Sequence, residues 1–279
     1  VHLRWELYPI PHEAKKKEYG GSYYEEMEWW KKPIKKSLVS ELLAMGEEIF
    51  LLKSVYHHNR CLWYVSSPFH IGLYLLVGLV GLLVLGAIVG MLGIPVSSDS
   101  SFLVGTATFY ITIAGGYSGL ALALIGCMGL LAKRFRNPSL RHVTSPADYC
   151  NLLYILLLLL SALAAWLLSD QTFTETREIT QSLLQFKGMH DPSSLILWEL
   201  TLFSFFLLYM PFTRMTHFFA KYFTYHKVRW EDTPNLPGGK TEGKTREALR
   251  FRVSWQANHI QTGKTWAEVA SEMPEEEDA

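Results

Sequence analysis

Two histidines, His70 and His217, lie within apolar stretches of the chain, where ionisable side chains are rare. An ionisable group in an apolar span is energetically costly, so such groups are usually paired or functional. Neutral imidazole is a common metal ligand, and two imidazoles that face each other across a helix bundle supply the axial ligands of a six-coordinate haem. The alternative is that both are interfacial histidines that hydrogen-bond to the backbone. A haem would require elements that bring the two rings to one depth.

Four long apolar runs separate charged N-terminal and C-terminal regions. Hydrophobic residues make up 49% of the 279-residue chain, and charged residues concentrate outside these runs. Each run is near or above the roughly 20 residues that cross a bilayer core as a helix. We therefore predict an all-α integral membrane protein, a helix bundle with spans at about 68–94, 102–132, 148–169 and 195–219.

The charges of the connecting loops predict the side of the membrane that each loop faces. The short loop 133–142 carries four Lys or Arg residues and no acid, which is typical of a cytoplasmic loop. The loops 95–101 and 170–194 carry more acids than bases and are expected outside. With four spans, both ends of the chain are then cytoplasmic.

This topology places the two histidines at the same depth. His70 follows Tyr64, and His217 precedes Tyr222, where both tyrosines fall in the expected inner aromatic belt. At 1.5 Å per residue, both histidines lie about 8–9 Å from that belt. Matched depth is what a haem between two helices needs.

Two further ionisable residues of the fourth span are candidates for functional roles. Glu199 precedes His217 by five whole turns of a continuous helix, so we expect both to face the bundle interior. Glu199 is either a proton acceptor for a quinol or a carboxyl that is protonated or hydrogen-bonded at the interface. Arg214 is a candidate partner for a haem propionate, or it simply extends to the membrane surface.

Glycines are frequent in the first two spans. Small residues permit close packing of helices, and they also leave room for a flat macrocycle. These glycines are Gly72, Gly78, Gly81, Gly86, Gly90, Gly105, Gly115, Gly116, Gly119, Gly126 and Gly129.

The three cysteines, Cys61, Cys127 and Cys150, show neither metal-binding spacing nor a c-type haem attachment motif. Any haem is therefore expected to be held without thioether bonds.

Short motifs around both histidines resemble those of a known family. Residues 211–217 (PFTRMTH) and 69–72 (FHIG) are similar to the gamma subunit of respiratory nitrate reductase, and the loop segments 136–138 and 144–148 also look like that family. Related proteins are the cytochrome b subunits of heterodisulfide reductase and of the sulfite-reduction-associated membrane complex. The resemblance covers about 68–230.

The resemblance implies a quinol-oxidising cytochrome b, which in the family has five helices and two haems. His70 and His217 match the histidine pair of the cytoplasmic-side haem, whereas the outer pair falls at Val80 and Glu199. It therefore implies one haem b and leaves the second site without its histidines. His190 is either a substitute ligand or a quinol-site residue. We expect the family's additional helix before His70 to come from a preceding segment or from a partner.

The sequence thus predicts a haem b subunit of a quinone/quinol oxidoreductase complex in a prokaryotic plasma membrane. It comprises a cytoplasmic partner-docking segment (1–65), a haem-binding bundle (66–222) and a cytoplasmic tail (223–279). The resemblance implies that the subunit, which is not expected to be an enzyme alone, moves electrons in either direction between menaquinol and a cytoplasmic iron–sulfur partner of heterodisulfide-reductase type. Lipids surround it, and no nucleic acid is involved.

Two alternatives belong to other functional classes. A haem-free membrane anchor for a soluble redox enzyme would leave His70 and His217 without a cofactor. A small transporter would need a polar pathway, but the spans offer one acid, Glu199, and no chain of polar residues.

Overall fold

The computed structural model describes residues 27–28, 31, 38–188, 191–217, 219, 236–256, 260 and 262–271. His190 and Tyr222, and most of 1–37, lie outside the described residues. The described part of the chain is helical, apart from loops and one isolated bridge between Arg252 and Thr265. Its helices are α1 (Leu38–Phe50), α2 (Lys53–His58), α3 (Arg60–Met91), α4 (Leu103–Arg136), α5 (Pro138–Val143), α6 (Pro146–Leu168), α7 (Thr174–Leu184), α8 (Ser194–Tyr209), the 3₁₀ turns η3 (Met210–Phe212) and η4 (Arg214–Thr216), α11 (Lys240–Leu249) and α12 (Trp266–Ser271).

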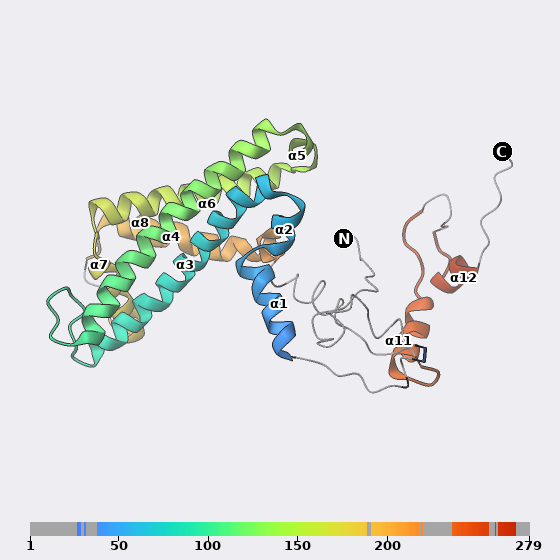
Figure 1. Cartoon of the computed structure of the whole chain (residues 1–279), viewed down its shortest axis with the longest axis horizontal. Helices are drawn as coiled ribbons and strands as arrows, with labels where there is room; N and C mark the ends of the chain where they lie inside the picture. The colour runs from blue at the N-terminus through green and yellow to red at the C-terminus, as the bar shows by residue number, and fades with distance from the viewer. Residues whose placement is uncertain are drawn as a thin grey trace. The chain divides into compact units, whose positions relative to one another are not determined.

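Four of these segments are long and apolar enough to cross a membrane: Arg60–Met91, Leu103–Arg136, Pro146–Leu168 and Ser194–Phe212. They form the bundle of Figure 1, with the short helix α7 at one end and α1 and α2 at the other. The prediction of an all-α bundle with four spans is confirmed. Helix α3, the first of the four spans, begins before its apolar run, where Asn59 caps it by accepting a hydrogen bond from the Leu62 N–H at 3.0 Å.

Glycines let α3 and α4 pack backbone against backbone in antiparallel register. A Cβ on Gly72 would overlap the backbone nitrogen of Ala123, and one on Gly126 would overlap the backbone of Phe69. Close packing is therefore what these glycines provide. Gly81, in contrast, has no atom within 4 Å of the place where its Cβ would be, so its face of α3 is open.

The end of the bundle around α7 is held by buried polar groups. Asp170 is 4% exposed and accepts hydrogen bonds from the N–H and Oγ1 of Thr176, both at 2.7 Å. Arg177 is 6% exposed, packs against Gly86 of α3, and donates from Nη1 to the carbonyl of Val96 at 3.2 Å. Burial lowers the pKa of Arg177, and the nearby Asp170 carboxylate opposes that change. Arg177 thereby joins α7, α3 and the loop that follows α3.

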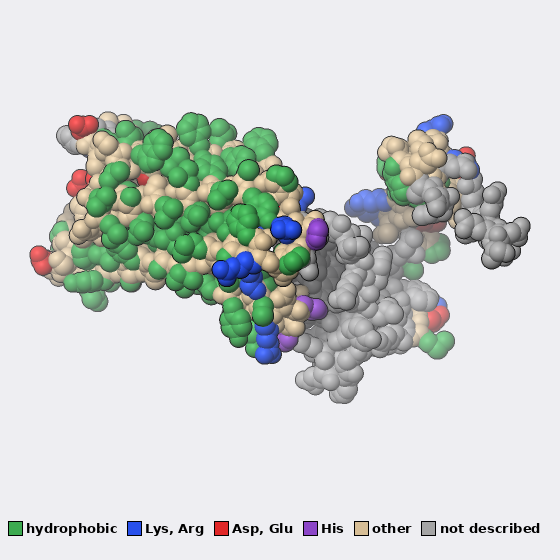
Figure 2. Space-filling view, turned by 90° about the horizontal axis from the view of Figure 1, so that it is seen from above, with side chains coloured by type: hydrophobic (Ala, Val, Ile, Leu, Met, Phe, Trp, Pro, Cys, Tyr) green, Lys and Arg blue, Asp and Glu red, His purple; other side chains and the backbone are tan. Residues whose placement is uncertain are grey.

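The two ends of the bundle differ in charge. Lys133, Arg134 and Arg136 lie in the last turn of α4, and the antiparallel register puts them at the end where α3 begins. On the face shown in Figure 2, basic and histidine side chains gather at one end of the bundle, acidic side chains lie at the other, and hydrophobic side chains cover the surface between them. This distribution is typical of a membrane-spanning bundle whose two water-facing ends carry different charge.

The chain divides into two units, one of residues 38–226 and one of residues 1–37 and 227–279. In the second unit, α11 and α12 flank a loop in which Val253 and Ile260 are buried. The rings of Trp255 and Trp266 lie 6.1 Å apart.

Candidate functional site

The structure brings His70 and His217 together. Their ring centres are 6.3 Å apart and their planes are inclined at 81°. His70 is half-buried on α3, and His217 directly follows η4. The described residues contain no group of three or more His, Cys, Asp or Glu side chains suited to a bare metal ion. A six-coordinate haem, whose macrocycle supplies four nitrogens itself, takes two axial ligands from the protein.

Both imidazoles are oriented by hydrogen bonds to main-chain carbonyls. His70 donates from Nδ1 to the carbonyl of Ser66 at 2.7 Å, and His217 donates from Nδ1 to the carbonyl of Arg214 at 3.1 Å. Because a carbonyl only accepts, the proton is assigned to Nδ1 in each ring, and the lone pair lies on Nε2. Metal-binding histidines usually have their other nitrogen fixed in this way.

The segment that presents His217 is not a continuation of the fourth helix. Helix α8 ends at Tyr209, and Pro211 then occupies the first turn of η3, where its missing N–H is tolerated. Thr213 is extended (φ −117°, ψ 170°), and its Oγ1 caps η4 by accepting from the Met215 N–H at 3.1 Å. The chain therefore reaches His217 through two short 3₁₀ turns.

This break corrects the predicted relation between Glu199 and His217. Five regular turns would have placed both side chains on one helix face, but the helix stops eight residues before His217. Glu199 lies on α8 about 15 Å from Tyr209 along the helix axis. Its carboxylate accepts a short hydrogen bond from Oγ of Ser161 on α6. Glu199 still faces a neighbouring helix of the bundle, as expected, but an unbroken helix does not relate it to His217.

Of the remaining candidates of the sequence, the structure describes Arg214 and Val80. The side chain of Arg214 is 77% exposed, and its Nη1 lies 3.5 Å from Oδ2 of Asp148 at the start of α6. Val80 is 48% exposed on α3, about 15 Å along the helix from His70. His190 is outside the described residues.

Two contacts near the histidines were not predicted. Asn151 is 8% exposed in the apolar span α6, and its Oδ1 accepts a hydrogen bond from the Tyr209 hydroxyl at 2.8 Å. Tyr74, one turn after His70, donates from its hydroxyl to the carbonyl of Ile49 in α1 at 2.9 Å. A lone amide in an apolar run was the available signal for Asn151, but its partner could not be read from local spacing.

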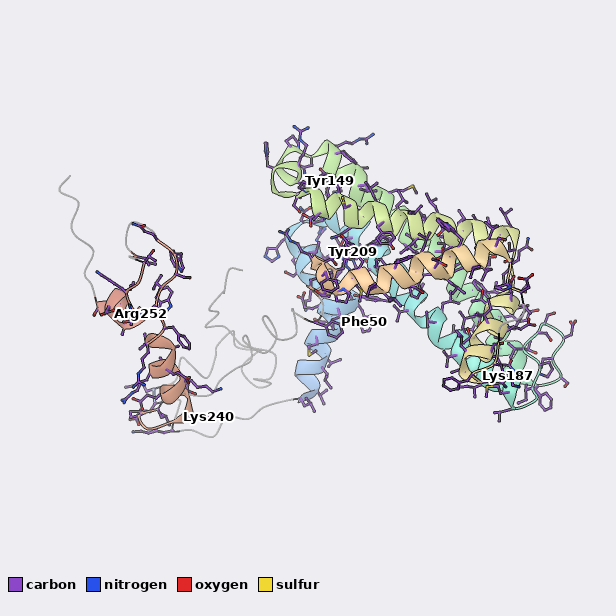
Figure 3. All side chains as sticks on the ribbon, turned by 180° about the vertical axis from the view of Figure 1, so that it is seen from behind. Phe50, Tyr149, Lys187, Tyr209, Lys240 and Arg252 are labelled. Carbon is purple, nitrogen blue, oxygen red and sulfur yellow. The ribbon has the colours of Figure 1, made fainter. Side chains whose placement is uncertain are left out.

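These contacts gather at one end of the bundle. Figure 3 shows Phe50, Tyr149 and Tyr209 at this end and Lys187 at the opposite end. The Phe50 ring lies 5.7 Å from that of Tyr74, so α1 ends beside the helix that carries His70.

Comparison with known proteins identifies one matching family. The sequence model described as nitrate reductase gamma subunit matches residues 53–231, a range that includes both histidines and all four spans. No curated protein matches the chain. No solved structure matches it either. In this family the members are membrane subunits that bind haem b and transfer electrons. The match spans well over half of the sequence, so the chain belongs to the nitrate reductase gamma subunit family.

Proposed function

We propose that His70 and His217 are the axial ligands of one haem b. Metal–nitrogen bonds to imidazole are about 2.0–2.1 Å long, so two rings on opposite sides of one metal have centres about 6 Å apart. The observed separation of 6.3 Å between the two ring centres is the observation that carries this proposal. The shared Nδ1–H assignment supports it, because each ring then offers Nε2 as the ligand atom.

In this proposal the chain is the membrane subunit of a quinone/quinol oxidoreductase complex. The haem supplies one-electron chemistry, while the protein orients the two imidazoles and excludes water with the packed helices α3 and α4. Electrons pass between menaquinol and a cytoplasmic iron–sulfur subunit of heterodisulfide-reductase type, in either direction. The absence of histidine at Val80 and Glu199 argues for a single haem.

Glu199 is the proposed proton acceptor for the quinol. It is half-buried in a lipid-crossing helix and already makes a polar contact with Ser161. A carboxyl in such a place is usually functional or paired. His190 remains a second candidate for the quinol site.

We propose that the partner docks near α1, on the side of the membrane where the histidines lie. Helix α1 exposes a row of apolar side chains, and its end is joined to α3 by Tyr74 and by Trp63, whose Nε1 donates to the carbonyl of Leu51 at 2.7 Å. The exposed apolar residues of this segment are Leu38, Val39, Leu42, Leu43, Ile49, Phe50 and Leu51. A partner on this surface would lie close to the haem. The basic end of α4 supports a cytoplasmic side here, in a prokaryotic plasma membrane.

Optical spectroscopy of the purified complex tests the haem site. The wild-type complex should show a reduced b-type α band, and pyridine haemochrome quantification should give about one haem per chain, as one pair of axial ligands implies. His70→Ala and His217→Ala should each abolish the band. His142→Ala, which alters an exposed histidine of α5, should retain it. A wild-type complex without the band would instead support the haem-free anchor.

A further inference from the structure

Helix α6 carries none of the proposed ligands, yet it contacts the end of α8 from which the chain continues to His217. Two residues of α6 that are one turn apart, Asn151 and Tyr154, contact the last two turns of α8. The Tyr154 hydroxyl donates to the carbonyl of Leu202 at 3.1 Å, and its ring lies 5.8 Å from both Phe206 and Tyr209. Asn151 accepts from the Tyr209 hydroxyl at 2.8 Å.

The apolar surroundings of Asn151 favour its hydrogen bond with Tyr209. A buried amide in an apolar span is costly unless it is hydrogen-bonded, and α6 offers Asn151 no aqueous surroundings at 8% exposure. Tyr209 is the last residue of α8. The pairing therefore ties the last residue of α8, two residues before the break at Pro211, to α6.

Local hydrogen bonds then hold the short segment 210–217 between the end of α8 and the His217 ring. Thr213 bonds to Met210 through its N–H at 3.1 Å and through its Oγ1 at 2.8 Å. It also caps Met215, and Arg214 then accepts from His217 Nδ1. The ion pair of Arg214 with Asp148 adds little, because Arg214 is largely exposed.

We propose that Asn151 is a positioning residue, which acts through Tyr209 to hold His217 at the distance from His70 that a shared haem needs. This inference rests on the proposed haem site. In this proposal α6 positions His217, the second axial ligand, although His217 itself belongs to the segment after α8. The function of the break at Pro211 is to let the chain leave the helix and meet α3.

The test uses the full chain in its membrane complex and reads the electron paramagnetic resonance spectrum of the ferric haem. Tyr209→Phe keeps the ring and removes the hydroxyl. We expect the haem to bind about 10–100-fold more weakly, as for other residues that orient metal ligands, with a broadened low-spin signal. Asn151→Leu should do the same, whereas Asn151→Asp keeps an acceptor oxygen and should retain the native spectrum. Tyr110→Phe, at an exposed site on α4, is the matched control.

The variants separate this inference from the proposed function. If His217→Ala leaves the haem signal intact, the haem site itself is wrong. If His217→Ala abolishes the signal but Tyr209→Phe and Asn151→Leu leave the spectrum and the haem affinity unchanged, the haem site stands and the positioning role is overturned. The role is also overturned if Asn151→Asp perturbs the spectrum as much as Asn151→Leu, because the acceptor oxygen would then be irrelevant.

Discussion

At the residue scale, the proposed role of Glu199 as a proton acceptor can be tested by a single substitution. Its contact with Ser161 joins α8 to α6 without involving either histidine. We expect Glu199→Gln to leave the haem spectrum unchanged and to slow haem reduction by a menaquinol analogue by about 10²-fold, the usual contribution of a positioned acid or base. Stopped-flow measurement of haem reduction gives this rate.

The control for Glu199 is Asp99→Asn, which neutralises an exposed acid of the loop after α3. It should leave the rate as it is in wild type. An unchanged rate in Glu199→Gln would reject the proton-acceptor role and make His190 the next residue to replace. A loss of haem in Glu199→Gln would mean that the carboxyl has a structural role.

At the element scale, one glycine of α4 and one of α3 allow a direct comparison. A methyl group at Gly126 would collide with the backbone of Phe69, the neighbour of His70, whereas Gly81 faces open space. Gly126→Ala should therefore destabilise the bundle by about 1–3 kcal/mol, as overpacking does, and should lower haem content. Thermal unfolding in detergent, followed through the haem band, measures both effects.

Gly81→Ala is the matched control, since it adds the same methyl group to a glycine in a span. It should leave the melting temperature unchanged or raise it slightly, because alanine restricts the unfolded chain more than glycine does. An equal fall in melting temperature and haem content in Gly81→Ala and Gly126→Ala would show that the effect does not come from the close approach of α3 and α4.

The elements also show what the sequence could predict. Apolar runs predicted all four spans, because the bilayer imposes length and composition on each helix separately. The pairing of His70 with His217 followed from loop charge and depth, which are also local features. The same reasoning failed from Tyr209 onwards, because helical spacing assumes an unbroken helix and Pro211 ends it. The contact between Asn151 and Tyr209 depends on how α6 and α8 meet, and local spacing carries no information about that.

At the scale of the whole molecule, the proposed function depends on which side of the membrane the histidine pair faces. The antiparallel register of α3 and α4 puts His70 at the same end as the basic residues that close α4. Positively charged short loops stay in the cytoplasm. We therefore expect the haem site, the basic loop after α4 and the segment around α1 to lie together on the cytoplasmic side, within reach of an iron–sulfur partner.

Cysteine labelling in intact cells tests this orientation. In a background with the exposed Cys61 and Cys150 replaced by serine, His142→Cys introduces a thiol at the basic end and Ser101→Cys one at the other end, both at exposed positions. A membrane-impermeant maleimide should label the Ser101→Cys protein in intact cells and the His142→Cys protein only after permeabilisation. The parent without either new thiol controls for Cys127, which is buried. The reverse pattern would put the histidine pair at the outer face, where it could not serve a cytoplasmic iron–sulfur subunit, and would require a different electron partner even if the haem is present.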